Sequence, residues 1–164
     1  MSIDTLLFHS PSKGPLQFKN VISSIAGYMA EDPHREYKII VGTDSSARNS
    51  TSLVTALIVH RVRYGAIYFL THSPVRTFAS LRDRIFDEAM TSIMLAQELR
   101  SHLRDVLDDT LLWDGDEIHV DIGENGPTKD LIEAVTGIIK GYQFIPVIKP
   151  YSFGASTVAD RHTG

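Results

Sequence analysis

Two aspartates lie at the ends of predicted β-strands, where carboxylates can bind a cation. Asp44 directly follows residues 37–43 (YKIIVGT), and Asp121 lies near the end of residues 117–122 (EIHVDI). In α/β sheets, ligands bind beyond the carboxyl ends of the parallel strands. If these two strands are neighbours, their two carboxylates would therefore lie side by side. Carboxylates held together repel each other and raise one pKa unless a cation joins them. An oxygen-only site of this kind suits Mg²⁺ or Mn²⁺.

Two further acids can join this pair. Glu88 borders the apolar stripe of a long predicted helix, three residues after Ile85, so it can face the sheet edge while Asp87 faces water. Asp160 lies in the final segment of the chain. Taken singly, a strand-end Asp is more often a turn or capping residue, and a Glu on a charged helix is usually solvated. Their joint occurrence in this order of elements favours a metal site.

The elements that must position these acids follow the order helix, three strands, helix, strand, helix, strand, helix. The expected helices cover residues 16–30, 78–108, 127–140 and 152–162, and the expected strands cover residues 37–43, 53–62, 66–71, 117–122 and 144–148. Three antiparallel strands followed by helix-crossover strands predict an α/β fold with a mixed five-stranded sheet. Pro146 cannot donate to a strand ladder, so the last strand should lie at an edge. Residues 1–15 are expected to form a loose arm before a single domain of residues 16–164.

This order of elements and acids resembles the ribonuclease H-like superfamily. The phrases KIIVGTDS, RIFDE and HVDIG are similar in particular to a bacterial family of predicted ribonuclease H-like proteins of unassigned function, over residues 16–163. The resemblance implies the strand order 3-2-1-4-5, with helices on both faces of the sheet. It also implies that Asp44, Glu88, Asp121 and Asp160 are catalytic and hold two Mg²⁺ or Mn²⁺ ions. The implied reaction is two-metal hydrolysis of phosphodiester bonds in RNA, RNA/DNA hybrid or structured DNA.

Departures from the superfamily pattern speak against two of its branches. Ser46 stands where proofreading-type exonucleases have a second acid. Residues 44–48 contain no glycine, whereas actin-like and hexokinase-like ATPases need a glycine-rich phosphate loop after the first strand. The main alternative to a nuclease is a non-catalytic nucleic-acid or protein-binding module with the same fold, and an ATPase-like phosphotransfer domain is a weaker one.

Other polar side chains near the acids are candidates for binding the substrate. These are Ser45, Arg76, Arg84, Lys149 and His162. The arginines can contact phosphates, although a solvated helix face with acidic partners accounts better for the basic residues of the long helix. Lys149 can reach a backbone phosphate, and His162 can transfer a proton to a leaving group. His119 is expected to be a hydrogen-bonded structural histidine, and Tyr151 could stack a base, although edge packing explains this tyrosine better.

Composition sets the outer limits of the function. The 164 residues include no Cys, which excludes disulfides, zinc-thiolate sites and thiol catalysis. Twenty acidic against 16 basic residues give a net charge of −4, so the chain is not a general duplex-coating protein and would grip nucleic acid locally. No apolar run is long enough for a membrane span, and the first residues carry no secretory signal, so we expect a cytoplasmic protein without a membrane partner.

Overall fold

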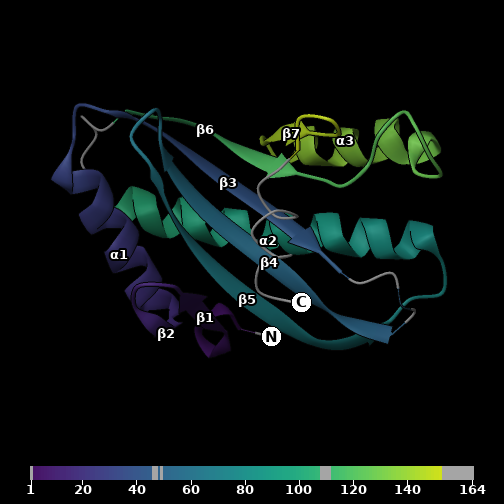
Figure 1. The fold of residues 1–164 in the computed structure, drawn as a ribbon, viewed down its shortest axis with the longest axis horizontal. Helices are drawn as coiled ribbons and strands as arrows, with labels where there is room; N and C mark the ends of the chain where they lie inside the picture. Colours follow the sequence, from purple (N-terminus) through teal and green to yellow (C-terminus); the bar gives the residue numbers. More distant parts are fainter. Residues whose placement is uncertain (1, 46–47, 49, 108–111, 153–164) are drawn as a thin grey trace.

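The centre of the protein is a mixed sheet of seven strands in the order β2-β1-β5-β4-β3-β6-β7 (Figure 1). The computed structural model describes residues 2–45, 48, 50–107 and 112–152. The strands are β1 (Leu7–Ser10), β2 (Gly14–Gln17), β3 (Glu36–Asp44), β4 (Ser50–Arg61), β5 (Ala66–Thr77), β6 (Leu112–His119) and β7 (Ile145–Val147). β3 pairs antiparallel with β4 and parallel with β6, and β6 pairs parallel with β7.

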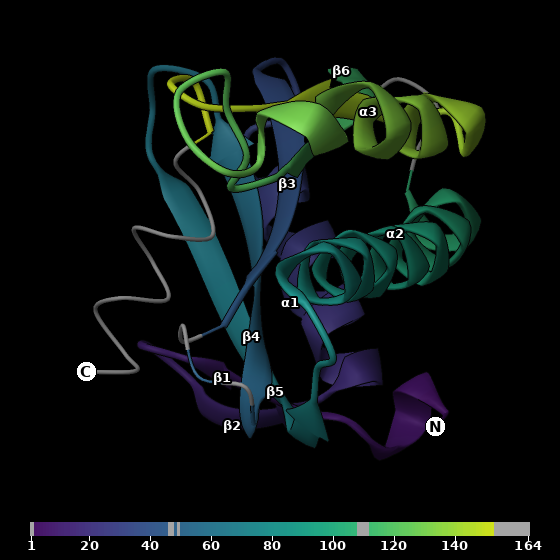
Figure 2. The same ribbon diagram turned by 90° about the vertical axis from the view of Figure 1, so that its right-hand side faces the viewer.

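Three α-helices pack on one face of this sheet (Figure 2). They are α1 (Phe18–Glu31), α2 (Leu81–Val106) and α3 (Ile132–Gly141). Two short 3-10 helices, η1 (Ile3–Thr5) and η2 (Lys129–Leu131), are the other helical elements of the described residues. Apolar residues at helical spacing bury one side of α1, which ends before Pro33 because the residue ahead of a proline disfavours the helical conformation. The Ser80 hydroxyl caps α2 by accepting from the Asp83 N–H.

Alternation along the central strands divides their side chains between the two faces. Tyr37, Ile39 and Val41 of β3 are fully buried in the core that the helices share. Val41 lies opposite Leu57 of β4 and Ile118 of β6, so the core continues across three strands. β3 therefore joins the antiparallel part of the sheet to its parallel part.

The predicted topology is confirmed, and the strand count is corrected. β5-β4-β3-β6-β7 is the expected 3-2-1-4-5 order, with β7 and its Pro146 at an edge. The sheet has seven strands rather than five, because β1 and β2, which cover most of residues 7–17, form a hairpin that pairs with β5 instead of a loose arm. The hairpin carries only one buried side chain in β1, Phe8, whose ring lies 5.9 Å from that of Phe18. Leu7 and Phe8 are adjacent and only Phe8 is buried, so the four residues of β1 show no alternation long enough to predict a strand.

The expectation of helices on both faces is met on one face only among the described residues. The helix expected at 152–162 falls almost entirely in residues 153–164, which lie outside the described part of the chain. None of the helices that the structure describes combines the length and the apolar character needed to cross a membrane.

Candidate active site

Parallel pairing brings Asp44 and Asp121 to the same end of the sheet. Gly42 of β3 lies opposite His119 of β6, and each aspartate follows its strand residue by two positions. Asp44 is the last residue of β3, and its carboxylate accepts a hydrogen bond of 2.8 Å from the Ser45 N–H. β6 covers residues 112–119 rather than the expected 117–122, so Asp121 lies two residues beyond the end of the strand. The parallel register nevertheless brings both aspartates to the same end of the sheet, as predicted.

Glu88 reaches this site from α2. It is only 5 % exposed, although it belongs to a helix whose other face carries many charges. Burial raises the pKa of Glu88 to about 8, and the negative charges of Asp44 and Asp121 act in the same direction. The Arg84 guanidinium and the Ser45 hydroxyl favour the charged form and oppose this shift. Asp44, Glu88 and Asp121 thus share one electrostatic environment, in which Glu88 keeps a proton over most of the neutral range.

A buried chain of hydroxyl groups fixes α2 against the strand that carries Asp44. Ser92 Oγ lies 2.7 Å from Thr43 Oγ1, and Thr43 Oγ1 lies 2.9 Å from Thr55 Oγ1. Thr43 directly precedes Asp44, and Ser92 follows Glu88 by one helical turn. This hydrogen bond therefore sets the distance between the two backbone segments that hold these acids.

We expect Ser92→Ala to lower the free energy of unfolding by about 1–2 kcal/mol, because it removes a buried hydrogen bond and leaves one Thr43 contact unmade. Chemical denaturation measures the change. Ser101→Ala, on the exposed side of the same helix, is the matched control and should change stability by less than about 0.5 kcal/mol. Equal effects of the two substitutions would contradict the role given to Ser92.

Two of the predicted substrate-binding cations lie at the acids. Lys149 Nζ lies 2.9 Å from Asp121 Oδ1, and Arg84 Nε lies 3.9 Å from Glu88 Oε1. The Lys149 backbone N–H donates to the Ile122 carbonyl oxygen at 2.9 Å, which holds the chain after β7 beside the chain after β6. These two cations supply positive charge to the acids in the structure.

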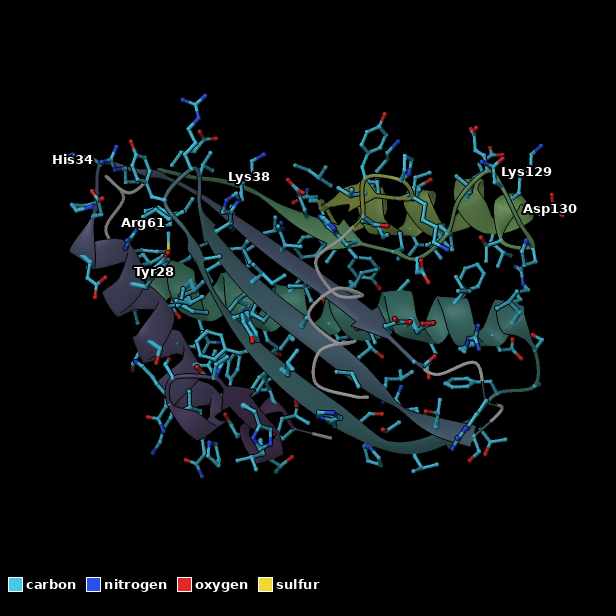
Figure 3. All side chains as sticks on the ribbon, viewed as in Figure 1. Tyr28, His34, Lys38, Arg61, Lys129 and Asp130 are labelled. Atoms are coloured by element: carbon cyan, nitrogen blue, oxygen red, sulfur yellow. The ribbon has the colours of Figure 1, made fainter. Side chains whose placement is uncertain are left out.

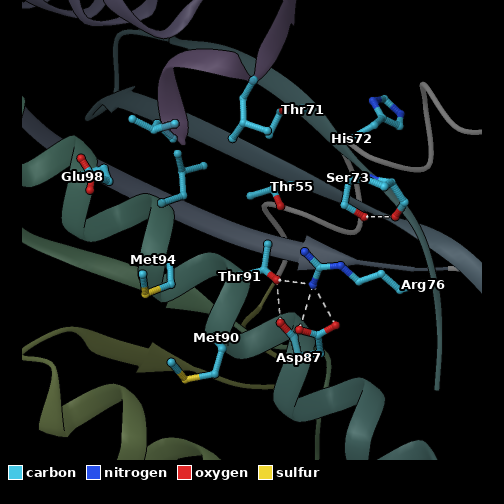
Figure 4. A pocket seen from close by; sticks show the side chains of 14 residues that line it. Thr55, Thr71, His72, Ser73, Arg76, Asp87, Met90, Thr91, Met94 and Glu98 are labelled. Atoms are coloured by element: carbon cyan, nitrogen blue, oxygen red, sulfur yellow. Dashed lines mark hydrogen bonds and ion pairs between the residues drawn. The ribbon is translucent and has the colours of Figure 1, made fainter. Parts of the chain in front are cut away.

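Arg76 forms an ion pair with Asp87 in the structure, and its predicted contact with a phosphate stays a prediction. Its Nη1 lies 2.9 and 2.8 Å from the two carboxylate oxygens of Asp87 and 3.4 Å from Thr91 Oγ1 (Figure 4). Asp87, expected to face water, is this ion-pair partner. The pair lines a pocket of about 390 Å³ between α2 and β5, and none of the three carboxylates discussed above lines it.

The remaining predictions divide into one that the structure supports and two that lie beyond it. His119 is buried, with Nε2 3.0 Å from Glu117 Oε1, which agrees with a structural histidine. Burial lowers the pKa of His119, so its neutral form is favoured. Asp160 and His162 lie outside the described residues.

Sequence reasoning missed the charged pair that connects α2 to β6. Arg100 Nε lies 2.9 Å from the buried Asp116 Oδ2, and Arg100 Nη2 donates to the Gln143 carbonyl oxygen at 2.9 Å. The guanidinium also lies 4.0 Å from the centre of the Phe144 ring. No local sequence pattern predicts a contact between residues 16 positions apart, and the charge pattern of the helix favours a solvated face for Arg100.

The hydroxyl chain between α2 and β3 did leave a signal in the sequence. Ser92 is a small polar residue beside the apolar stripe of the helix.

The chemistry of the three acids fits a hard divalent cation, because all of their donors are oxygen atoms. Within the described ranges, however, no group of three Asp, Glu or His side chains is arranged to hold an ion as it stands. A cation bound by Asp44, Glu88 and Asp121 would therefore have to displace the proton of Glu88 and compete with Lys149 for Asp121.

Comparison with known proteins assigns the fold to a family. A family described as "Ribonuclease H-like" matches residues 20–164. The chain belongs to the ribonuclease H-like family. This ribonuclease H-like chain is also similar to "Uncharacterized protein YkuK" of Bacillus subtilis (strain 168), with 36% identity over 169 residues that cover 98% of each protein. No solved structure matches the chain.

Proposed function

We propose that this ribonuclease H-like protein is a metal-dependent nuclease that hydrolyses phosphodiester bonds. The observation that carries the proposal is the burial of Glu88 on α2, together with the parallel register that brings Asp44 and Asp121 to the same end of the sheet. Burying a carboxyl group beside two further acids costs free energy, which the proton of Glu88 and the nearby Arg84 offset only in part. A cation bound between the three acids would remove the repulsion between their negative charges.

In the proposed mechanism, Asp44, Glu88, Asp121 and Asp160 would hold two Mg²⁺ or Mn²⁺ ions. Bound there, the ions would activate the attacking water and stabilise the leaving oxygen. Glu88 gives up its proton when it becomes a ligand, because its raised pKa belongs to the site without a cation.

Residues around the acids bind the nucleic acid and move a proton. Arg84 and Lys149, which lie at Glu88 and Asp121, would contact phosphate oxygens, and the Ser45 hydroxyl would add a hydrogen bond beside Asp44. His162 is the candidate for protonating the leaving group. With few basic residues at the site and a net charge of −4, the protein grips its substrate locally, and the substrate is RNA, RNA/DNA hybrid or structured DNA.

A second candidate function is a non-catalytic nucleic-acid or protein-binding module. The 2.9 Å contact of Lys149 with Asp121 favours it, because a permanently bound lysine would replace the metal rather than yield to it. Catalysis separates the two functions.

The test is cleavage of labelled RNA/DNA hybrid, single-stranded RNA, single-stranded DNA and branched DNA with Mn²⁺. We expect Asp44→Asn to lower the rate at least about a hundredfold, since it removes a charged group that would hold the cations. Asp130→Asn neutralises an exposed aspartate of η2, just before α3 (Figure 3), and should retain the wild-type rate. If wild type and Asp44→Asn are equally inactive on all substrates, the protein is not a nuclease.

A further inference from the structure

A pocket of about 480 Å³ lies between the loop after β6 and the turn after β7. Its walls are the loop after β6, with Gly123, Glu124 and Asn125, and the turn after β7, with Ile148, Lys149 and Tyr151. The volume lies within the range of small-molecule sites in proteins, about 300–1,000 Å³. Lys149 has a role in the proposed nuclease function, whereas that function assigns no ligand to the pocket that Lys149 lines.

Backbone hydrogen bonds hold the two walls together. The Val120 N–H donates to the Val147 carbonyl oxygen at 3.0 Å, and the Lys149 N–H donates to the Ile122 carbonyl oxygen at 2.9 Å. A Cβ atom on Gly123 would lie 2.9 Å from the Cβ of Lys149, so the close approach of loop and turn requires a residue without a side chain. The pocket is therefore preformed rather than dependent on a moving loop.

Lys149 connects this pocket to the three acids. The residue lines the pocket, and its Nζ lies 2.9 Å from Asp121 Oδ1. An anionic group bound by the Lys149 ammonium would therefore lie next to the carboxylates, and the rest of the same ligand could enter the pocket. A nucleotide fits this description, because its phosphate is anionic and its nucleoside could occupy the pocket.

The other lining residues suit a nucleobase. Tyr151 is 75 % exposed, so its ring is available for stacking, and stacking on an aromatic ring tolerates every base. Glu124 and Asn125 are exposed and offer acceptor and donor groups for the edge of a base.

We propose that this pocket is the subsite for one unpaired nucleotide adjacent to the phosphate that Lys149 contacts. The inference rests on the proposed nuclease function and deepens it, because a base stacked on Tyr151 cannot remain in a duplex stack. The substrate is then a single strand, or the unpaired end or branch of a structured nucleic acid, with little preference for base sequence.

The test measures binding of nucleoside 5′- and 3′-monophosphates to the full chain in EDTA by ligand-observed NMR titration. We expect Tyr151→Ala to weaken binding about tenfold, since it removes the stacking partner. Tyr151→Phe keeps the ring and should bind within about twofold of wild type. Tyr64→Ala removes an exposed tyrosine from the β4–β5 turn, at the opposite end of the sheet, and should leave the affinity unchanged.

Three results would overturn the subsite. They are no nucleotide binding to the wild type, equal affinity of wild type and Tyr151→Ala, and binding of inorganic phosphate as tightly as the nucleotides. The titration contains no hydrolysis, so the two proposals fail separately. Tyr151-dependent nucleotide binding without cleavage would support the pocket and reject the nuclease, whereas cleavage with Tyr151-independent binding would reject the pocket alone.

Discussion

Glu88→Gln is expected to stabilise the metal-free protein by about 4 kcal/mol at pH 8 and to flatten its stability between pH 5 and 8. The pKa of Glu88 is raised from 4.5 to about 8 by burial and by the neighbouring aspartates. Between these values the folded protein binds a proton that the unfolded chain has released. The stabilisation that this proton provides is complete below about pH 4.5 and is lost as the pH rises through about 8. Glutamine does not titrate, so the variant loses this dependence.

Chemical denaturation in EDTA at pH 5, 6.5 and 8 measures this difference. The advantage of Glu88→Gln over wild type should grow with each step in pH, because only the wild type must bury an increasingly charged carboxyl group. Glu133→Gln neutralises an exposed glutamate of α3 and should follow the wild-type profile. A wild-type stability that runs parallel to that of Glu88→Gln over this range would show that Glu88 is not held protonated.

Arg100→Ala is expected to destabilise the protein by about 3–5 kcal/mol. The substitution takes the guanidinium away from the carboxylate of Asp116, which is 3 % exposed and cannot recover its hydration. It also removes the hydrogen bond to Gln143 and the contact with the ring of Phe144, which together connect α2 to the start of β7.

A double-mutant cycle with Asp116→Asn identifies the ion pair as the cause. If the pair carries the effect, the double variant should be more stable than the sum of the single effects predicts, because neither charge is then left buried without the other. Arg35→Ala breaks an exposed pair with Asp32 and should cost no more than about 1 kcal/mol. Additive effects of Arg100→Ala and Asp116→Asn would contradict a coupled pair.

The order of the strands was predictable because each central strand has its own local signature. The apolar run before Asp44 marks β3 as buried on both faces, and Pro146 marks β7 as an edge. Parallel register then follows from the crossover helices, which is why Asp44 and Asp121 could be expected at one end of the sheet.

The partners of the charged residues were not predictable, because ion pairs between distant segments leave no periodic trace. Arg76 was expected near the acids and instead binds Asp87, one residue from Glu88 but on another side of α2. A rotation of 100° per residue separates neighbouring helix positions, so proximity in sequence did not imply a shared site. The contact of Lys149 with Asp121 depends on the close approach at Gly123, which only the three-dimensional structure shows.

Titration of the EDTA-treated, dialysed protein with Mn²⁺, followed by isothermal calorimetry, tests the cation site most directly. We expect the wild type and Asp130→Asn to bind Mn²⁺, and Asp44→Asn and Asp121→Asn to bind it at least about tenfold more weakly. We also expect binding to release a proton near pH 7, because Glu88 would lose its proton on becoming a ligand. Proton release appears as a dependence of the heat on the ionisation enthalpy of the buffer. Absence of Mn²⁺ binding to the wild type, or equal affinity in all four proteins, would contradict the proposed site.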